Sequence, residues 1–276
     1  MINSQHMMNG RRVAFASGAI LADAALLDAD GPGADGPGAD RPGADRFDAG
    51  HVDASPAPQA LFEPQFWTGK GRIEPVAGGR GAAWFIDHGS EHWVLRHYRR
   101  GGFMARLSQD RYLWTGESRV RAFAEYRLLA DLSARGLPVP APVGARYERC
   151  GLWYRCDLIT RRIQGAVSMS GLLAAGPLAE SSWRRVGSAI AELHAAGVDH
   201  ADLNAHNILL DGRGTVSIID FDRSRVRRAG VWAAQNLSRL RRSLAKITAG
   251  LPPDRFSCEG WRSLLAGYAE RRAGDG

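Results

Sequence analysis

Residues 198–222 read Val-Asp-His-Ala-Asp-Leu-Asn-Ala-His-Asn-Ile-Leu-Leu-Asp-Gly-Arg-Gly-Thr-Val-Ser-Ile-Ile-Asp-Phe-Asp. A polar loop is followed by a short apolar run, a glycine-containing turn, and a β-branched run that ends in an acidic pair. Because an Asp-Gly-Arg-Gly turn between two apolar runs is typical of a β-hairpin, we expect these two runs to pair as strands. The hairpin would hold three polar side chains, Asp202, Asn207 and Asp220, at one mouth.

These three side chains form the set that phosphoryl transfer requires. One carboxylate can orient an attacking hydroxyl and accept its proton. A second carboxylate and an amide oxygen are hard ligands that suit Mg²⁺ ions on a triphosphate. The alternative is that they are ordinary polar residues beside a turn, and the ordered spacing of the whole set argues against it.

The spacing His-x-Asp-Leu-x-x-x-x-Asn, followed after a strand by Asp-Phe, resembles the catalytic loop and metal-binding motif of the protein-kinase-like fold. The resemblance implies that Asp202 is the catalytic base and that Asn207 and Asp220 are Mg²⁺ ligands. It implies that His200 braces the loop. It also implies an α+β, two-lobed fold, with a small antiparallel-sheet N-lobe and a mainly helical C-lobe.

Composition limits the class of protein. The 276 residues include 36 Lys+Arg against 29 Asp+Glu, and 45% of them are hydrophobic, enough for a substantial core. Arginine supplies nearly all of the positive charge, so an acidic partner is expected: a nucleotide, an anionic lipid, an acidic sugar or nucleic acid. Cys150, Cys156 and Cys258 have neither the even count of a disulfide framework nor zinc-ligand spacing, which favours the cytoplasm.

The first part of the chain is expected to be a flexible, low-complexity leader at 1–60. Residues 29–45 repeat Ala-Asp-Gly-Pro-Gly imperfectly, a composition that cannot build a core. The apolar stretch 13–27 behind Arg11-Arg12 has the outline of a signal peptide, but Asp23 interrupts it. A strand or short helix that packs on the first lobe is the alternative. We expect the N-lobe at 61–160 and the C-lobe at 161–276.

A glycine cluster lies upstream of the catalytic loop. Gly78, Gly79 and Gly81 precede an apolar run, and a backbone without side chains can approach phosphates closely. In isolation a plain hairpin turn explains such a cluster equally well. Placed before a kinase-like loop, it is a candidate phosphate-covering loop.

Arg96 is the candidate residue for holding the α- and β-phosphates. It lies on the alternating run 92–98, which is where a kinase has its third strand and a lysine. That lysine normally pairs with a helix glutamate. Glu125, on the predicted helix 121–132, is our candidate partner, and Glu117 competes with it. An exposed strand arginine remains the alternative for Arg96.

Two tracts are strongly basic. One runs from Arg99 to Arg121 with few acids, and the other has no acid from Arg223 to Lys246. Each is either a solvated surface or a site for an acidic headgroup, a phosphoryl acceptor or a membrane. His194 and His206 have no third ligand at suitable spacing, so we interpret both as structural.

Several features separate the chain from protein kinases. Asn204 stands where Ser/Thr kinases have a lysine, Asp222 replaces the glycine of Asp-Phe-Gly, and no long activation segment follows. The closest resemblance is to the bacterial 3-deoxy-D-manno-octulosonic acid (Kdo) kinase family. It extends from about Leu61 to the C-terminus. The stretches that carry it are 78–85, 95–102, 201–209 and 219–223, and in that family arginine occupies the third-strand position.

This resemblance implies a function. The expected reaction is ATP- and Mg²⁺-dependent phosphorylation of the 4-hydroxyl of a Kdo sugar on a lipid A precursor. The enzyme would be peripheral on the cytoplasmic face of the inner membrane, against an anionic surface, with no nucleic acid partner. Arg99, Arg100, Arg223 and Arg225 are the hypothetical acceptor-binding groups.

Two alternatives stay open at this stage, together with the oligomeric state. The chain could be another kinase-like enzyme, such as a heptose, aminoglycoside or atypical protein kinase. It could also be a non-catalytic pseudokinase that binds anionic lipid, although the intact set Asp202, Asn207 and Asp220 argues against that interpretation.

Overall fold

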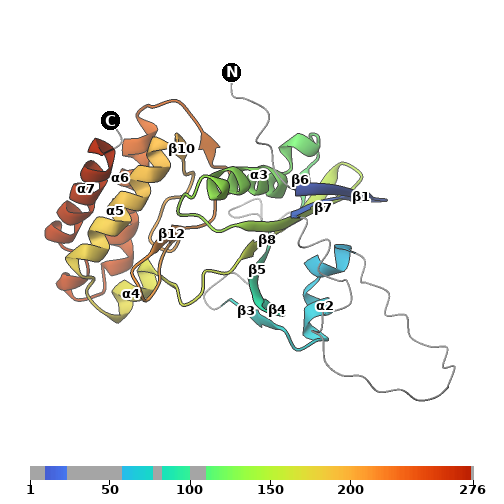
Figure 1. Cartoon of the computed structure of the whole chain (residues 1–276), viewed down its shortest axis with the longest axis horizontal. Coiled ribbons are helices and arrows are strands. Elements are labelled where there is room, and N and C mark those ends of the chain that lie inside the picture. The colour runs from blue at the N-terminus through green and yellow to red at the C-terminus, as the bar shows by residue number, and fades with distance from the viewer. Residues whose placement is uncertain (1–9, 24–57, 77–82, 100–109, 275–276) are drawn as a thin grey trace, which may run out of the picture.

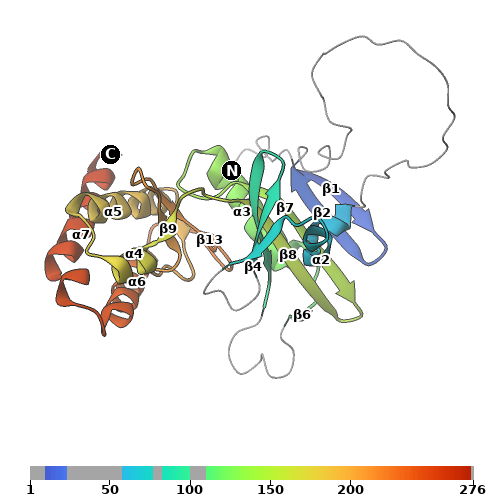
Figure 2. The same ribbon diagram turned by 90° about the horizontal axis from the view of Figure 1, so that it is seen from below.

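The structure is a computed structural model that describes residues 10–23, 58–76, 83–99 and 110–274. Figures 1 and 2 show a twisted sheet accompanied by helix α3, with helices α4 to α7 gathered at the other end of the molecule. We call the described residues up to 161 the sheet half and those from 162 onward the helical half. The predicted mixture of helices with an antiparallel sheet is confirmed.

The sheet half contains an eight-stranded sheet. Seven strands lie in the order β1-β2-β7-β8-β5-β4-β3, β6 pairs with β8, and all these neighbours are antiparallel. The strands are β1 (Gly10–Phe15), β2 (Gly18–Asp23), β3 (Ile73–Pro75), β4 (Ala83–His88), β5 (Glu91–His97), β6 (Tyr112–Leu113), β7 (Pro142–Cys150) and β8 (Trp153–Arg161).

Helices cover both faces of this sheet. On one face lies α3 (Arg121–Ala134), which follows the short η4 (Glu117–Arg119) and buries a stripe of Phe123, Tyr126, Leu129 and Leu132. On the other face, η2 (Pro58–Phe62) and α2 (Pro64–Thr68) pack against Trp93 and Leu95 of β5. Because side chains alternate along a strand, Arg96 extends to the face opposite Trp93 and Leu95.

The prediction that residues 1–60 form a flexible leader is wrong for residues 10–23 and 58–60. Strands β1 and β2 form a hairpin, and β2 lies inside the sheet because Gly18 to Ala22 pair with β7. Residues 19–22 are almost completely buried. Ala19 and Leu21 belong to the apolar cluster that includes α3, and Ile20 and Ala22 belong to the cluster that includes α2. The alternative of a strand that packs on the first lobe is the one observed. The repeat at residues 29–45 lies outside the described residues.

The helical half is built on four helices: α4 (Met169–Ala175), α5 (Glu180–Ala195), α6 (Trp232–Thr248) and α7 (Cys258–Ala273). Short strands connect them: β9 (Val167–Ser168), β10 (Val198–Asp199), β11 (Ile208–Leu210), β12 (Val216–Ile218) and β13 (Arg225–Val226), with the turn η5 (Pro253–Arg255). In the sheet half, the predicted helix 121–132 is confirmed as α3, which continues to Ala134. No helix among the described residues is long and apolar enough to cross a membrane.

Helices α5 and α7 approach each other to backbone contact. A Cβ atom added to Gly187 would lie 1.9 Å from the Leu264 carbonyl oxygen, and one added to Gly267 would lie 2.1 Å from the Arg184 carbonyl oxygen. Only glycine allows this separation. The pair therefore forms a closely packed support on which the catalytic loop is built.

Burial of His194 makes the stability of this support dependent on pH. Its Nδ1 atom lies 2.9 Å from the Tyr268 hydroxyl, and burial lowers the pKa of His194 to about 4. The unfolded chain takes up the proton near the ordinary value of 6.5, so stability present at pH 7 is lost as the pH falls below 6.5. Between pH 7 and pH 5 this residue accounts for about 2 kcal/mol of the free energy of unfolding.

We therefore expect His194→Gln to lose about 2 kcal/mol less stability than the parent protein between pH 7 and pH 5, measured by urea unfolding. His206→Gln is the matched control, because His206 is exposed. Equal losses in the parent and in His194→Gln would contradict the prediction.

Candidate active site

The predicted hairpin forms and brings the motif residues to one end. Strands β11 and β12 are antiparallel with Ile208 opposite Ile218, and the Ile219 N–H donates to the Asn207 carbonyl at 2.9 Å. Pairing thus continues one step beyond the strands. Asn207 and Asp220 leave the hairpin at the same mouth, which the loop that carries Asp202 enters.

The loop around Asp202 is held by its own asparagines. The Asp202 carbonyl accepts hydrogen bonds from Nδ2 of Asn207 at 3.0 Å and of Asn204 at 3.1 Å. The Asn204 Oδ1 atom accepts from the backbone N–H groups of His206 and Asn207. The Asp202 side chain is exposed. The loop therefore fixes the Asp202 backbone and leaves its carboxylate accessible to an incoming hydroxyl.

His200 joins this loop to the end of the second hairpin strand. Its side chain is buried, Nδ1 accepts from the Asp202 N–H at 3.2 Å, and Nε2 donates to the Ile219 carbonyl at 3.1 Å. This pattern requires the neutral ring with its proton on Nε2. Burial lowers the pKa of His200, which favours that neutral form. The residue occupies the bracing position that the sequence predicts.

Asp220 has an uncommon backbone conformation. Its φ angle is +65°, in the left-handed region that non-glycine residues rarely adopt. The preceding carbonyl is held by His200, and the following N–H, from Phe221, donates to Glu125 Oε1 at 3.0 Å. These two bonds fix the turn and direct the Asp220 carboxylate toward Arg96, whose Nη1 lies 3.0 Å from Oδ1.

Arg96 connects Asp220 to Glu125. Its Nη2 atom lies 2.9 and 3.2 Å from the two Glu125 oxygens, and Glu125 also accepts a hydrogen bond from the Tyr98 hydroxyl. Although burial works to lower it, the charges of Glu125 and Asp220 raise the pKa of Arg96, so Arg96 is a permanent cation. Burial raises the pKa of Glu125, and the Arg96 charge opposes that rise.

The competing glutamate, Glu117, lies elsewhere. Its carboxylate pairs with Arg12 of β1 at 2.8 Å and accepts a hydrogen bond from the Tyr147 hydroxyl at 2.8 Å. It therefore ties β1 to η4 and β7 within the sheet half. Of the two candidates, Glu125 is the one that contacts Arg96.

A second ion pair beside the site was missed by the sequence analysis. Arg121, the first residue of α3, donates through Nε to Asp222 Oδ1 at 2.8 Å and through Nη2 to the other carboxylate oxygen. The only sequence signal was the aspartate in place of the usual glycine after Asp-Phe. This pair holds the segment after Asp220 against the start of α3.

Helix α6 packs against the loop that carries His200 and Asp202, a contact that the sequence analysis did not predict. Asn236 is buried, its Oδ1 accepts from the His200 N–H at 3.0 Å, and its Nδ2 donates to Asp199 Oδ1 at 3.0 Å. Arg239 Nη1 donates to the His200 carbonyl at 3.3 Å. A buried asparagine on an otherwise apolar helix face was the available signal.

Asn207 and Asp220 offer oxygen donors of the kind that Mg²⁺ binds. The Asn207 amide nitrogen is engaged with the Asp202 carbonyl, so its oxygen faces the opposite way. The Asp220 side chain is 41% exposed, and only one of its oxygens contacts Arg96. Within the described ranges, no group of three or more His, Cys, Asp or Glu is arranged so that it could hold a metal ion. Two protein oxygens fit an ion whose other ligands are phosphates and water.

The remaining predicted residues fall into two groups. Arg99, Arg223 and Arg225 are exposed, the last on β13, and their contact with an acceptor stays a prediction. Gly78, Gly79, Gly81 and Arg100 lie outside the described residues. The phosphate-covering role of the glycine loop therefore also stays a prediction.

Arrangement and chemistry together define a class of protein. The sheet carries an arginine that pairs with a helix glutamate. Near it lie a loop with a candidate carboxylate base and two side chains suited to binding Mg²⁺. This combination defines a kinase-like phosphotransferase site. Comparison with known proteins identifies the particular family. The chain belongs to the lipopolysaccharide kinase (Kdo/WaaP) family, whose model matches residues 64–268. The family resemblance predicted from the motifs is thereby confirmed.

Similar curated proteins carry one name, 3-deoxy-D-manno-octulosonic acid kinase. The one from Stenotrophomonas maltophilia (strain K279a) is 52% identical over 190 residues, which cover 68% of this chain and 75% of the relative. The one from Xanthomonas axonopodis pv. citri (strain 306) is 50% identical over 194 residues, covering 69% and 76%. The one from Xylella fastidiosa (strain 9a5c) is 46% identical over 188 residues, covering 68% and 75%.

The different contacts of Glu125 and Glu117 predict different effects of substitution. We expect Glu125→Gln to lower kcat/KM for ATP about 10- to 100-fold, the equivalent of one hydrogen bond to a charged group, because a neutral amide no longer balances Arg96. Glu117→Gln is the matched control and should stay within about twofold, because its ion pair is at the surface. Thermal melting would verify that both variants fold. Equal kcat/KM values for the two variants would contradict the assignment.

Proposed function

We propose that this protein transfers the γ-phosphoryl group of ATP to the 4-hydroxyl of a Kdo sugar on a lipid A precursor. The observation that carries the proposal is the bridge from Glu125 through Arg96 to Asp220, which faces the Asp202 loop. The name shared by relatives 46 to 52% identical supports Kdo as the acceptor sugar. The 4-hydroxyl rests on the family resemblance alone.

Each residue of the site has a proposed role. The exposed Asp202 carboxylate orients the acceptor hydroxyl and accepts its proton. Asn207 and Asp220 would hold Mg²⁺, which neutralises charge on the ATP phosphates when it is bound. Arg96, kept in position by Glu125, contacts the α- and β-phosphates. The sheet and helical halves correspond to the N-lobe and C-lobe of a kinase, with the nucleotide between them.

The surroundings of the site supply proposed roles for further residues. Gly78, Gly79 and Gly81 would cover the phosphates, and the acceptor carboxylate and lipid phosphates would meet Arg99, Arg100, Arg223 and Arg225. A lipid-linked acceptor favours a peripheral enzyme on the cytoplasmic face of the inner membrane, where ATP is present.

The acceptor is tested by phosphate transfer from labelled ATP with Mg²⁺. We expect turnover with a Kdo-bearing lipid A precursor, none with the same precursor lacking Kdo, and none when Mg²⁺ is removed by a chelator. NMR of the product would locate the new phosphate on the 4-hydroxyl. Transfer to a heptose or aminoglycoside acceptor but not to the Kdo-bearing lipid would replace the proposed acceptor, and ATP binding without any transfer would favour the pseudokinase.

The general base is tested by Asp202→Asn. Since base catalysis contributes roughly 10²- to 10⁴-fold, we expect kcat to fall by about that factor while the KM for ATP changes little. Asp211→Asn is the matched control. Its side chain accepts hydrogen bonds from the Arg213 and Thr215 N–H groups in the same hairpin, and an asparagine oxygen keeps those bonds. A kcat of Asp202→Asn within severalfold of the parent would overturn the assignment.

A further inference from the structure

Exposed apolar side chains gather in two segments of the described chain. Seven large apolar side chains are exposed among the described residues, and five of them belong to these segments. Leu113, Leu152 and Trp153 form the first segment, which we call the hairpin tip. Val226 and Val231 belong to the second, residues 223–231, which we call the arginine segment. The arginine segment contains four arginines, and further arginines lie beside the hairpin tip.

The hairpin tip is the turn between β7 and β8 together with the neighbouring strand β6. Leu113 pairs with Trp153, and the Trp114 N–H donates to the Leu152 carbonyl at 2.8 Å. Leu152 is 70% exposed, Leu113 53% and Trp153 40%. Since the polypeptide holds these side chains on paired strands, their exposure is a built feature of the fold.

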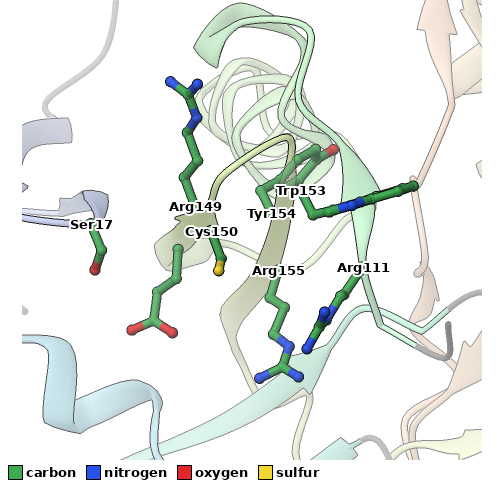
Figure 3. A pocket seen from close by; sticks show the side chains of 8 residues that line it. Ser17, Arg111, Arg149, Cys150, Trp153, Tyr154 and Arg155 are labelled. Carbon is green, nitrogen blue, oxygen red and sulfur yellow. The ribbon is translucent and has the colours of Figure 1, made fainter.

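Arginines surround the hairpin tip on both faces. Arg111, Arg149 and Arg155 line a cavity of about 240 Å³ together with Trp153 and Tyr154. Figure 3 shows Arg111 and Arg155 extending to the same side of the hairpin and Arg149 extending away from them. Arg155 pairs with Asp110 at 2.7 Å, and Arg149 lies over the Trp114 ring.

The arginine segment is more strongly charged. Arg223, Arg225, Arg227 and Arg228 are all exposed, and the sequence has no acidic residue between Arg223 and Lys246. Pairing of β13 with β10 holds this segment beside the catalytic loop. Val226 and Val231 are 54% and 77% exposed among these cations. Apolar and cationic side chains thus alternate on one short stretch.

Arg121 connects the two segments at the site. Its backbone N–H donates to the Tyr154 hydroxyl at 3.3 Å, and its guanidinium lies 4.7 Å from the centre of the Tyr112 ring. Tyr112 and Tyr154 adjoin Leu113 and Trp153 in the hairpin tip. The same guanidinium pairs with Asp222, which directly precedes Arg223. In Figure 3, Trp153 points toward the orange ribbon of the helical half. One guanidinium, that of Arg121, therefore contacts both Tyr112, next to Leu113 of the hairpin tip, and Asp222, next to Arg223 of the arginine segment.

We propose that the hairpin tip and the arginine segment together form a docking surface for a membrane that contains anionic lipid. Arginine suits lipid phosphates, and tryptophan with aliphatic side chains suits the boundary between headgroups and acyl chains. A protein partner would be expected to offer acids at the positions of these arginines, whereas a bilayer supplies phosphates and an apolar layer at once. The inference rests on the proposed function in one respect: docking here would present a lipid-linked acceptor to Asp202.

The test is flotation of the full chain with vesicles, without ATP or acceptor. Vesicles of phosphatidylcholine with roughly one third phosphatidylglycerol are compared with phosphatidylcholine alone. We expect binding only to the anionic vesicles, weakened by high salt. Leu152→Glu and Val231→Glu should each reduce the partition coefficient about tenfold or more, because each removes an apolar contact and adds a repelled charge. Leu265→Glu, at an exposed position of α7, is the matched control and should bind as the parent does.

Four outcomes would overturn the docking surface. They are equal binding to both kinds of vesicle, unchanged binding of Leu152→Glu, an equal loss in the Leu265→Glu control, or no vesicle binding, which would leave the segments for a protein partner. Phosphate transfer to a Kdo-bearing acceptor dispersed in detergent is measured in parallel. There, Leu152→Glu should retain the parent rate. A parent protein that floats with anionic vesicles but transfers no phosphate would refute the proposed function and leave the docking surface standing.

Discussion

One buried carboxylate, Glu125, determines the geometry of the site. It accepts hydrogen bonds from the Arg96 guanidinium, the Tyr98 hydroxyl and the Phe221 N–H, so it joins β5, its own helix α3 and the turn after Asp220. Loss of one partner from a buried ion pair costs about 3–5 kcal/mol, because the other charge is left uncompensated. The three elements are therefore held in one arrangement, in which Arg96, the candidate phosphate-binding cation, lies beside Asp220, the candidate metal ligand.

The helical half fixes the other side of the site by different means. Neutral His200 bonds to the Asp202 loop and to the strand end before Asp220, and buried Asn236 anchors that loop to α6. Behind them, the glycine contacts of α5 with α7 leave little room for adjustment. The loop of the base candidate is thus held mainly by hydrogen bonds of neutral side chains, whereas the Arg96 side of the site depends on paired charges.

The parts of the site predictable from sequence are those whose chemistry requires fixed local spacing. Asp202, Asn207 and Asp220 lie within one loop and hairpin, so their proximity followed from the turn alone. The choice between Glu125 and Glu117 could not be made from the sequence. Glu117 lies just before α3 and Glu125 lies on it, so only tertiary packing shows which of them contacts Arg96. The pairing of Arg121 with Asp222 and the support from Asn236 join residues distant in sequence, which no local pattern reports.

The N-terminal hairpin shows a different limit. Its apolar run is short and is followed by a repeat-rich tract, which favours interpretation as a leader, yet Gly18 pairs with Glu148 far along the chain. A strand so far away in the sequence pairs wherever the sheet has an unpaired edge strand, and the local sequence pattern does not identify that edge strand.

Because β2 lies between β1 and β7, the repeat-rich tract joins two parts of one folded unit. It is an insertion into the domain and not an extension in front of it. The family match begins at residue 64 and so excludes two strands of the sheet, β1 and β2. A protein shortened to that boundary would present the unpaired edge of β7, together with the apolar surface that residues 19–22 normally cover, as a template for association with other chains.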